Sequence, residues 1–260
     1  MSNYGMTKEA YENILIKYRI AIYNFEEIFI KQIYNNEPAK EKTKEEEDNT
    51  TYFQIFKQHI LCNPIIWMLA IAYVFVYIIR FGTEDWLVKY LVEVKHNTLP
   101  VASAKLSSLA LVGSAGAIMA GIISDKLCKG NRTPVNIAFL ILLILSLYLF
   151  ANNPTGKPIF EVLDYVYAAM IGVFTAGPQM MIGGLCAVES SSKKVASASI
   201  GFTGVFGYIG AALSSSGTGF VVDKFGWNGA ITFWIISTAI CVIICSILLV
   251  YEQLRKKKKA

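Results

Sequence analysis

The sequence predicts an all-α membrane protein with six transmembrane helices. Hydrophobic residues make up 54% of the 260 residues and charged residues only 17%, whereas a soluble domain usually carries about a quarter charged residues. Six apolar segments after residue 62 each approach the ~20 residues that ~30 Å of hydrocarbon requires. We expect spans at Pro64 to about Val92, Lys105 to Ile123, Pro134 to Ala151, Ile159 to Leu185, Val195 to Val222 and Gly229 to Tyr251.

Residues 1–50 differ in composition from the six-helix region at 51–255. KEAYENILIKYRIAIYNFEEIFIKQIYNN has apolar residues at helical spacing, and the charged stretch EPAKEKTKEEEDNTT follows it. We therefore expect a polar amphipathic arm and then a charged, flexible linker. An ordinary cytosolic helix is the favoured interpretation of the arm, and a helix lying on the membrane surface is the alternative. The first residues show no signal-peptide pattern, so we expect no cleaved leader.

The first span contains an arginine in the stretch VFVYIIRFGTEDW, at residues 74–86. A helix from Pro64 to Val92 would be about 43 Å long, so it could cross the membrane and continue past Arg80. Two interpretations stay open at this point. Arg80 lies inside the bundle as part of a binding site, or a shorter helix ends near it and the side chain extends to the outer membrane surface.

Four polar or aromatic residues of this span share one helical face. Tyr73, Tyr77, Arg80 and Glu84 are spaced four, three and four residues apart, and such residues are neighbours on a helix. A planar guanidinium can donate two parallel hydrogen bonds to an anion, which suits a phosphate. This face is therefore a candidate phosphate site.

The fourth and fifth spans are interrupted as well. Gly177 and Pro178 break the fourth span, and glycine and serine are scattered through the fifth. Interrupted spans tend to line a pathway. We expect the first, fourth and fifth spans to do so, with Gly177 and Pro178 as a hinge. The uninterrupted third and sixth spans should form a scaffold that faces lipid.

The loops predict the orientation of the six spans. DKLCKGNRT, ESSSKK and the tail EQLRKKKK are basic, whereas NNPTGKP and VDKFGWNG hold one lysine each. Lysine and arginine accumulate on the cytoplasmic side of a membrane. With six crossings the three basic segments fall on one side. We expect both ends of the six-helix unit, and the basic tail at residues 256–260, to be cytoplasmic.

Several motifs, in order and at matching intervals, resemble one known family. They are similar to the C-terminal half of the organophosphate:inorganic phosphate antiporters of the major facilitator superfamily, of the glycerol-3-phosphate and hexose-phosphate transporter type. The resemblance covers about residues 51–255. It implies one six-helix bundle, half of a major facilitator superfamily fold, in a bacterial inner (cell) membrane. The motifs are NPIIWMLAIAYVFVYIIRFGTEDWLVKYLVEVKH, GIISDKLCKGNRTP, AGPQMMIGG, GFTGVFGYIGA and DKFGWNG.

The resemblance also implies a mechanism and a set of site residues. Members exchange organic phosphate for inorganic phosphate by alternating access between two bundles, each of which supplies one arginine to a phosphate clamp. Arg80 matches the arginine of the C-terminal bundle, and Tyr77 and Tyr208 match tyrosines of the same cavity. Tyr73, on the face of Arg80, completes the expected substrate-binding set. The positions expected to act in ion pairing or gating are Asp85, Asp125 and Arg132.

This sequence departs from the family pattern at two positions of interest. Ala110 stands where relatives usually have a membrane-embedded glutamate, and Ala176 where glycerol-3-phosphate carriers have a tyrosine. GFTGVFGY resembles the glycerol-3-phosphate type, whereas GPQMMIGG resembles the hexose-phosphate sensor branch. The resemblance therefore leaves the organic phosphate undecided.

The expected partners follow from the same resemblance. The first bundle of the family, with the second arginine, is not among these 260 residues, so we expect a separate N-terminal six-helix half. The other partners are the lipid bilayer, an organic phosphate and inorganic phosphate. An organophosphate-sensing receptor and an inactive remnant are the alternatives. We expect no enzyme, cofactor, metal or nucleic acid, because the spans hold no catalytic or metal-binding set and topology already explains the basic tail.

Overall fold

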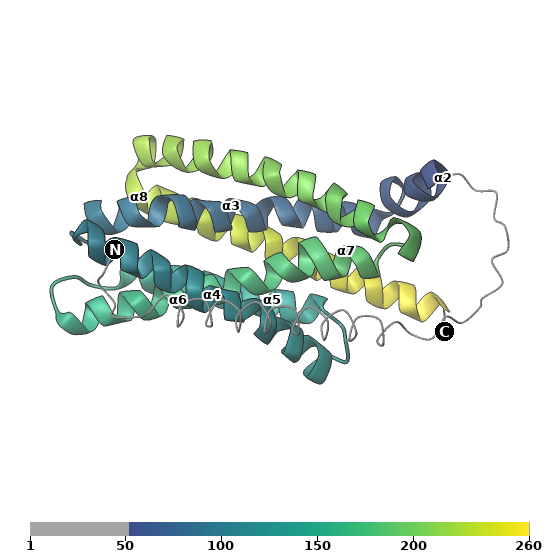
Figure 1. Ribbon diagram of the computed structural model, residues 1–260, viewed down its shortest axis with the longest axis horizontal. Helices are drawn as coiled ribbons and strands as arrows, with labels where there is room; N and C mark the ends of the chain where they lie inside the picture. The colour runs from purple at the N-terminus through teal and green to yellow at the C-terminus, as the bar shows by residue number, and fades with distance from the viewer. Residues whose placement is uncertain (1–51, 260) are drawn as a thin grey trace, which may run out of the picture. The chain divides into compact units, whose positions relative to one another are not determined.

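The computed structural model describes residues 52–259, with side chains for 53–255, and these residues are almost entirely helical (Figure 1). The polar arm and linker expected at residues 1–50 lie outside the described part. No β-strand occurs between residues 52 and 259. The elements are α2 (Tyr52–Phe56), the π-helix η1 (Lys57–Leu61), α3 (Pro64–Glu93), α4 (Leu99–Leu127), α5 (Thr133–Asn152), α6 (Pro158–Met180), the π-helix η2 (Met181–Leu185), α7 (Cys186–Glu189), the 3-10 helix η3 (Lys193–Val195) and α8 (Ala196–Lys259).

α8 consists of two helices on either side of a break at Gly226. This residue has φ 69° and ψ −172°, a left-handed φ that glycine adopts without steric cost. The two parts of α8 lie along the bundle as separate ribbons joined at this break (Figure 1). Within residues 52–259, five helical segments are long and apolar enough to cross a membrane, and the last, Lys193–Arg255, contains both of the final predicted spans. Each of the six predicted spans thus corresponds to a helix of sufficient length and apolarity.

The helix starts are specified by local sequence signals. The Asn63 side chain accepts a hydrogen bond from the amide of Ile65 at 3.1 Å, which caps α3, and Pro64 follows in the first turn. Proline also lies in the first turn of α4, α5 and α6, where its lack of an N–H has no cost. The second span was predicted to begin at Lys105, but α4 starts earlier, at Leu99. Lys105, taken as the polar start of that span, lies inside the helix, where it is buried and paired with Asp164.

The bundle is organised around close helix pairs. α3 packs mainly against α8, α4 against α6, and α5 against both α6 and α8. The backbones of α4 and α6 touch: a Cβ added to Gly172 would lie 2.1 Å from the carbonyl oxygen of Leu109, and one added to Gly116 would lie 2.1 Å from that of Val173. Small residues allow such approach in membrane helices. Glycine therefore sets the spacing of the α4–α6 pair.

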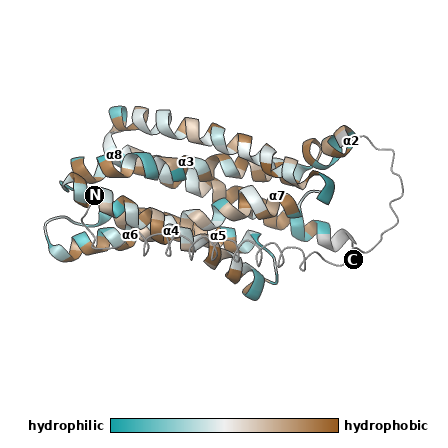
Figure 2. Ribbon diagram, viewed as in Figure 1, coloured by the Kyte–Doolittle hydropathy of each residue, from teal (hydrophilic) through white to brown (hydrophobic). Residues whose placement is uncertain are grey.

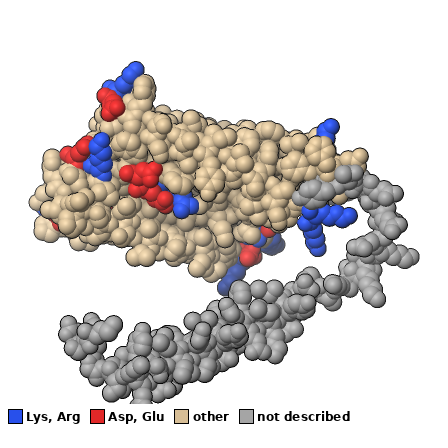
Figure 3. Space-filling view, turned by 45° about the horizontal axis from the view of Figure 1, so that its top comes forward, with Lys and Arg blue, Asp and Glu red and all other residues tan. Residues whose placement is uncertain are grey.

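The exterior of the bundle is largely apolar. Large side chains such as Leu111, Ile118 and Ile122 on α4 are exposed, and contiguous exposed apolar surface marks a membrane or protein contact. Brown residues recur along the long helices in Figure 2, and uncharged side chains cover most of the face seen in Figure 3. The chain thus has the surface of a multi-pass membrane protein.

Candidate functional site

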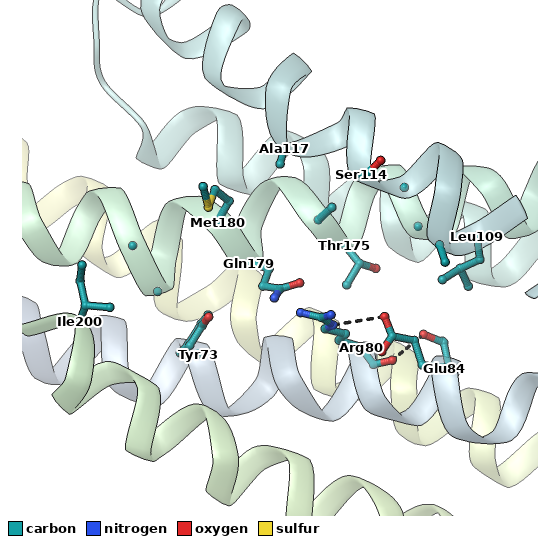
Figure 4. Close-up of a pocket in the computed structure, with 17 residues that line it drawn as sticks. Tyr73, Arg80, Glu84, Leu109, Ser114, Ala117, Thr175, Gln179, Met180 and Ile200 are labelled. Atoms are coloured by element: carbon teal, nitrogen blue, oxygen red, sulfur yellow. Dashed lines mark hydrogen bonds and ion pairs between the residues drawn. The ribbon is translucent and has the colours of Figure 1, made fainter. Parts of the chain in front are cut away.

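A cavity of about 430 Å³ lies among α3, α4 and α6. This volume falls within the range of roughly 300–1,000 Å³ that is typical of small-molecule sites. α3 contributes Tyr73, Arg80, Thr83 and Glu84, while the other walls come mainly from α4, α6 and η2. In Figure 4 the Arg80 side chain points into this space, toward α6. The first and fourth predicted spans therefore line a common cavity.

Arg80 lies within a continuous helix. α3 runs on to Glu93, so the alternative of a shorter helix that ends near Arg80 is wrong. The side chain is 32% exposed, and its Nε donates a hydrogen bond to Oε1 of Glu84 at 3.2 Å. Its two terminal nitrogens make no hydrogen bond to the described residues. Because a guanidinium has five N–H donors in a planar fork, these nitrogens can bind an anion from the cavity.

The three tyrosines of the expected site occupy different positions. Tyr73 lines the cavity and is 7% exposed, and its hydroxyl donates a hydrogen bond to the hydroxyl of Tyr77 at 3.2 Å. Tyr77 is not among the lining residues, although its ring lies 4.5 Å from that of Tyr73 and 6.0 Å from that of Tyr208. Tyr208 is 70% exposed on the surface of α8. The structure therefore brings Tyr73 and Arg80 into the cavity and connects Tyr208 to them only through Tyr77.

The helix α6 continues through Gly177 and Pro178, where an interruption was predicted, and becomes irregular only after Met180. Pro178 lies inside α6, and the backbone then forms the π-helical turn η2. Gly183 of this turn lines the cavity, and the Thr203 hydroxyl donates to its carbonyl at 3.1 Å. π-Helical turns are frequent at functional sites, and irregular membrane backbone is tolerated where protein buries it or water reaches it. The hinge function of this segment stays a prediction.

Sequence reasoning missed the contribution of α4 to the cavity. Ala110, Gly113, Ser114 and Ala117 line it, although the second span was not expected to line a pathway. These four residues recur at helical spacing, i, i+3, i+4 and i+7, and all are small. That small-residue stripe is the signal that could have identified this wall.

The residues expected to act in ion pairing do not line this cavity. Asp85 accepts a hydrogen bond from the Ser215 hydroxyl at 3.1 Å, which connects α3 with α8. Arg132 pairs with Asp125 at 3.4 Å and with Glu189 at 2.8 Å. Arg132 lines a second, polar cavity of about 590 Å³ beside the loop between α4 and α5. The gating function of these residues stays a prediction.

A buried ionic cluster joins α4 and α6 near their N-terminal ends. The sequence analysis did not predict this cluster. Asp164 pairs with Lys105 at 3.1 Å and with Lys95 at 3.5 Å, and these three side chains are at most 4% exposed. Asn153 donates a hydrogen bond to Asp164 at 2.7 Å, and Lys105 donates one to Asn97 at 2.7 Å. One carboxylate thus balances two buried ammonium groups in a shared hydrogen-bond network.

The cluster predicts a pH dependence of stability. Lys95 lies in the loop between α3 and α4, and burial, together with the charge of Lys105, lowers its pKa below 10.5, although Asp164 opposes this. At pH values between the pKa of Lys95 in the folded chain and its pKa in the unfolded chain, the unfolded chain binds more protons. The free energy of unfolding should therefore rise with pH in that range. Lys95→Met should remove this contribution.

The measurement is the unfolding temperature of both proteins in detergent from about pH 7 to about pH 10. Lys89→Met, which replaces a half-exposed lysine of α3, is the control and should keep the slope of the unchanged protein. Parallel curves for Lys95→Met and the unchanged protein would contradict the prediction.

Among residues 53–255, no group of three or more His, Cys, Asp and Glu side chains is placed to hold a metal ion. The Arg80 cavity instead offers a cationic fork, a tyrosine hydroxyl and a largely apolar wall. This set of groups is suited to binding an anion that carries an organic part.

The chain matches the Major Facilitator Superfamily over residues 28–215. It is 35% identical over 211 residues to the glycerol-3-phosphate transporter of Bacillus subtilis, covering 81% of this chain and 47% of that protein. It is 37% identical over 199 residues to a probable hexose phosphate transport protein of Chlamydia pneumoniae, with coverages of 75% and 42%. It is 36% identical over 176 residues to the membrane sensor protein UhpC of Escherichia coli, with coverages of 68% and 39%. The chain spans about half the length of these relatives or less.

Proposed function

Because the chain belongs to the Major Facilitator Superfamily, we propose that it is the C-terminal half of a carrier that exchanges organic phosphate for inorganic phosphate by alternating access. The observation that carries this proposal is Arg80, whose terminal nitrogens reach a small-molecule cavity among three membrane helices. Similarity to glycerol-3-phosphate and hexose phosphate transporters supports phosphate as the charged group.

In this proposal Arg80 binds two oxygens of the phosphoryl group with its terminal nitrogens. Glu84 holds Nε of the same guanidinium at 3.2 Å, which orients the fork before the anion arrives. Such preorganisation reduces the entropy lost on binding. Tyr73 lines the cavity wall, and Tyr77 and Tyr208 extend this aromatic path toward the surface.

The exposed face beside Tyr208 is the proposed contact with a second six-helix bundle. Val205, Tyr208 and Ile209 of α8 are exposed there, and an aromatic and aliphatic surface of this kind suits a helix–helix contact. Alternating access needs two bundles that move against each other around the binding site. We propose that the unit lies in a bacterial cell membrane with both of its ends in the cytoplasm, because basic segments accumulate on the cytoplasmic side.

Reconstitution tests the transport function. The chain is joined, through its residues 1–50, to the N-terminal half of the Bacillus subtilis relative, and the fusion is placed in vesicles loaded with radioactive phosphate. External glycerol-3-phosphate or glucose-6-phosphate should release the internal phosphate, and Arg80→Lys should slow this exchange at least tenfold, since it removes a charged bidentate contact. A folded fusion that binds phosphate but exchanges none would contradict carrier function.

A phosphate sensor is a second candidate, favoured by the similarity to a membrane sensor protein. A sensor would bind organic phosphate in the same cavity without sustained exchange. Binding by the fusion without release of internal phosphate is therefore the outcome that selects the sensor over the carrier.

A further inference from the structure

Gln179 is the polar side chain of the cavity that makes no hydrogen bond within the described residues. It lies on α6 directly after Pro178, and in Figure 4 its amide points toward the Arg80 guanidinium. The other polar lining side chains are already paired: Tyr73 with Tyr77, Glu84 with Arg80, Thr83 with the carbonyls of Ile79 and Arg80, Thr175 with that of Ile171, and Ser114 with that of Leu111.

The chemistry of this amide differs from that of Arg80. A carboxamide has two N–H donors and one carbonyl acceptor, whereas a guanidinium only donates. The phosphoryl group of a doubly ionised phosphate monoester offers only acceptors, so it can use the N–H groups of Gln179 but not the carbonyl. Inorganic phosphate near pH 7 has a P–O–H donor, but it has no carbon-bound hydroxyl that could reach Gln179 while Arg80 holds the phosphoryl oxygens. A hydroxyl group both donates and accepts, so it can satisfy both ends of the amide. The partner that best matches Gln179 is therefore a hydroxylated carbon chain.

The cavity has room for such a chain next to Arg80. Its volume is about 430 Å³, and its walls on α4 and α6 include Ala110, Gly113, Ala117 and Ala176. None of these side chains extends beyond a methyl group, so the walls restrict the space little. They also present no polar atom that could compete with Gln179 for a hydroxyl.

We propose that Gln179 is the specificity-determining residue that distinguishes a hydroxylated phosphate monoester from inorganic phosphate. Arg80 holds the phosphoryl group common to both ligands, and the Gln179 amide binds hydroxyl groups of the organic part. This inference rests on the proposed function, since it takes Arg80 as the phosphate-binding group. It adds the residue that recognises the other end of the ligand.

The test compares four ligands with the purified chain in detergent, by ligand-observed phosphorus NMR titration. Inorganic phosphate and methyl phosphate carry no alcohol hydroxyl, whereas glycerol-3-phosphate and glucose-6-phosphate do. The unchanged chain should bind the hydroxylated esters more tightly than methyl phosphate. Gln179→Leu should weaken glucose-6-phosphate binding about tenfold, as expected for one or two hydrogen bonds lost from a partly buried site, with inorganic phosphate within about twofold.

Gln179→Asn keeps the amide on a shorter side chain. It should keep part of the preference for hydroxylated esters over methyl phosphate that Gln179→Leu loses. Equal weakening of all four ligands by Gln179→Leu, or no weakening of any, would overturn the inference. If Gln179→Leu does not fold, the unchanged chain still tests the inference. Equal affinity of the unchanged chain for methyl phosphate and glucose-6-phosphate would also overturn the inference. If the unchanged chain binds inorganic phosphate but shows no preference, only this inference fails. If neither it nor its fusion with the N-terminal half binds any of the four ligands, the proposed phosphate function fails with it.

Discussion

Asp164→Asn should lower the free energy of unfolding by about 3–5 kcal/mol, the usual cost of removing one partner from a buried ion pair. Asp164 is 4% exposed and is the carboxylate that balances Lys95 and Lys105. Asparagine keeps the shape of the side chain but removes its charge, so two buried ammonium groups would remain without a counter-ion. Equilibrium unfolding in detergent, followed by tryptophan fluorescence, measures the loss.

Glu161→Gln is the matched control for this substitution. Glu161 lies in the first turn of the same helix, α6, and is exposed. The same chemical change should alter the free energy of unfolding there by less than about 0.5 kcal/mol. Equal effects of Asp164→Asn and Glu161→Gln would show that the buried cluster does not stabilise the bundle.

A double substitution separates charge from packing. Lys105→Met combined with Asp164→Asn removes one buried cation together with the carboxylate, and leaves Lys95, whose pKa burial already lowers. The double variant should therefore be less destabilised than the sum of its single variants. Strict additivity would indicate that each side chain acts through packing alone.

Arg80→Lys should weaken inorganic phosphate binding by roughly 10- to 100-fold. A charged hydrogen bond contributes about 1.5–3 kcal/mol, and each 1.4 kcal/mol corresponds to about a factor of ten in affinity. Lysine keeps the positive charge but replaces the planar fork by a point charge, so the bidentate contact is lost. Phosphorus NMR titration of the purified chain measures the change.

Glu84→Gln should strengthen phosphate binding, which is the opposite of the effect expected for Arg80→Lys. The Glu84 carboxylate binds Nε of Arg80 at 3.2 Å and lines the same cavity, so it repels an incoming phosphate as well as orienting the guanidinium. Removing its charge should strengthen phosphate binding several-fold, because the like-charge repulsion disappears while the amide oxygen can still accept from Nε.

Lys89→Gln tests whether a positive charge on α3 outside the cavity affects phosphate binding. Lys89 is half-exposed, pairs with Glu93 and does not line the cavity. Its replacement should leave phosphate affinity unchanged. If Arg80→Lys and Lys89→Gln had equal effects, Arg80 would not be the phosphate-binding group.

Much of the bundle could be predicted from local sequence. The length of each apolar segment determined the six spans, and the four-residue and three-residue spacing placed Tyr73, Tyr77, Arg80 and Glu84 on one face. The hydrogen bonds Tyr73–Tyr77 and Arg80–Glu84 confirm that shared face. Such predictions succeed because the rise and period of a helix depend only on neighbours within about one turn.

The cavity and the ionic cluster depended on contacts between distant parts of the chain. Gln179 faces Arg80 and Asp164 meets Lys105 only because α3, α4 and α6 are neighbours in the bundle. No local pattern specifies which helices pack together or how closely they approach.

The sequence by itself therefore determined the membrane class, the six crossings and the polar face of the first span. The tertiary structure alone decided that Arg80 reaches a cavity lined by α4 and α6, and that Tyr208 lies outside that cavity on the surface of α8. The physical reason is the backbone contact of Gly172 with α4, which brings the two cavity walls together. Whether a charged side chain is buried and paired is determined by packing of this kind, between residues far apart in the chain.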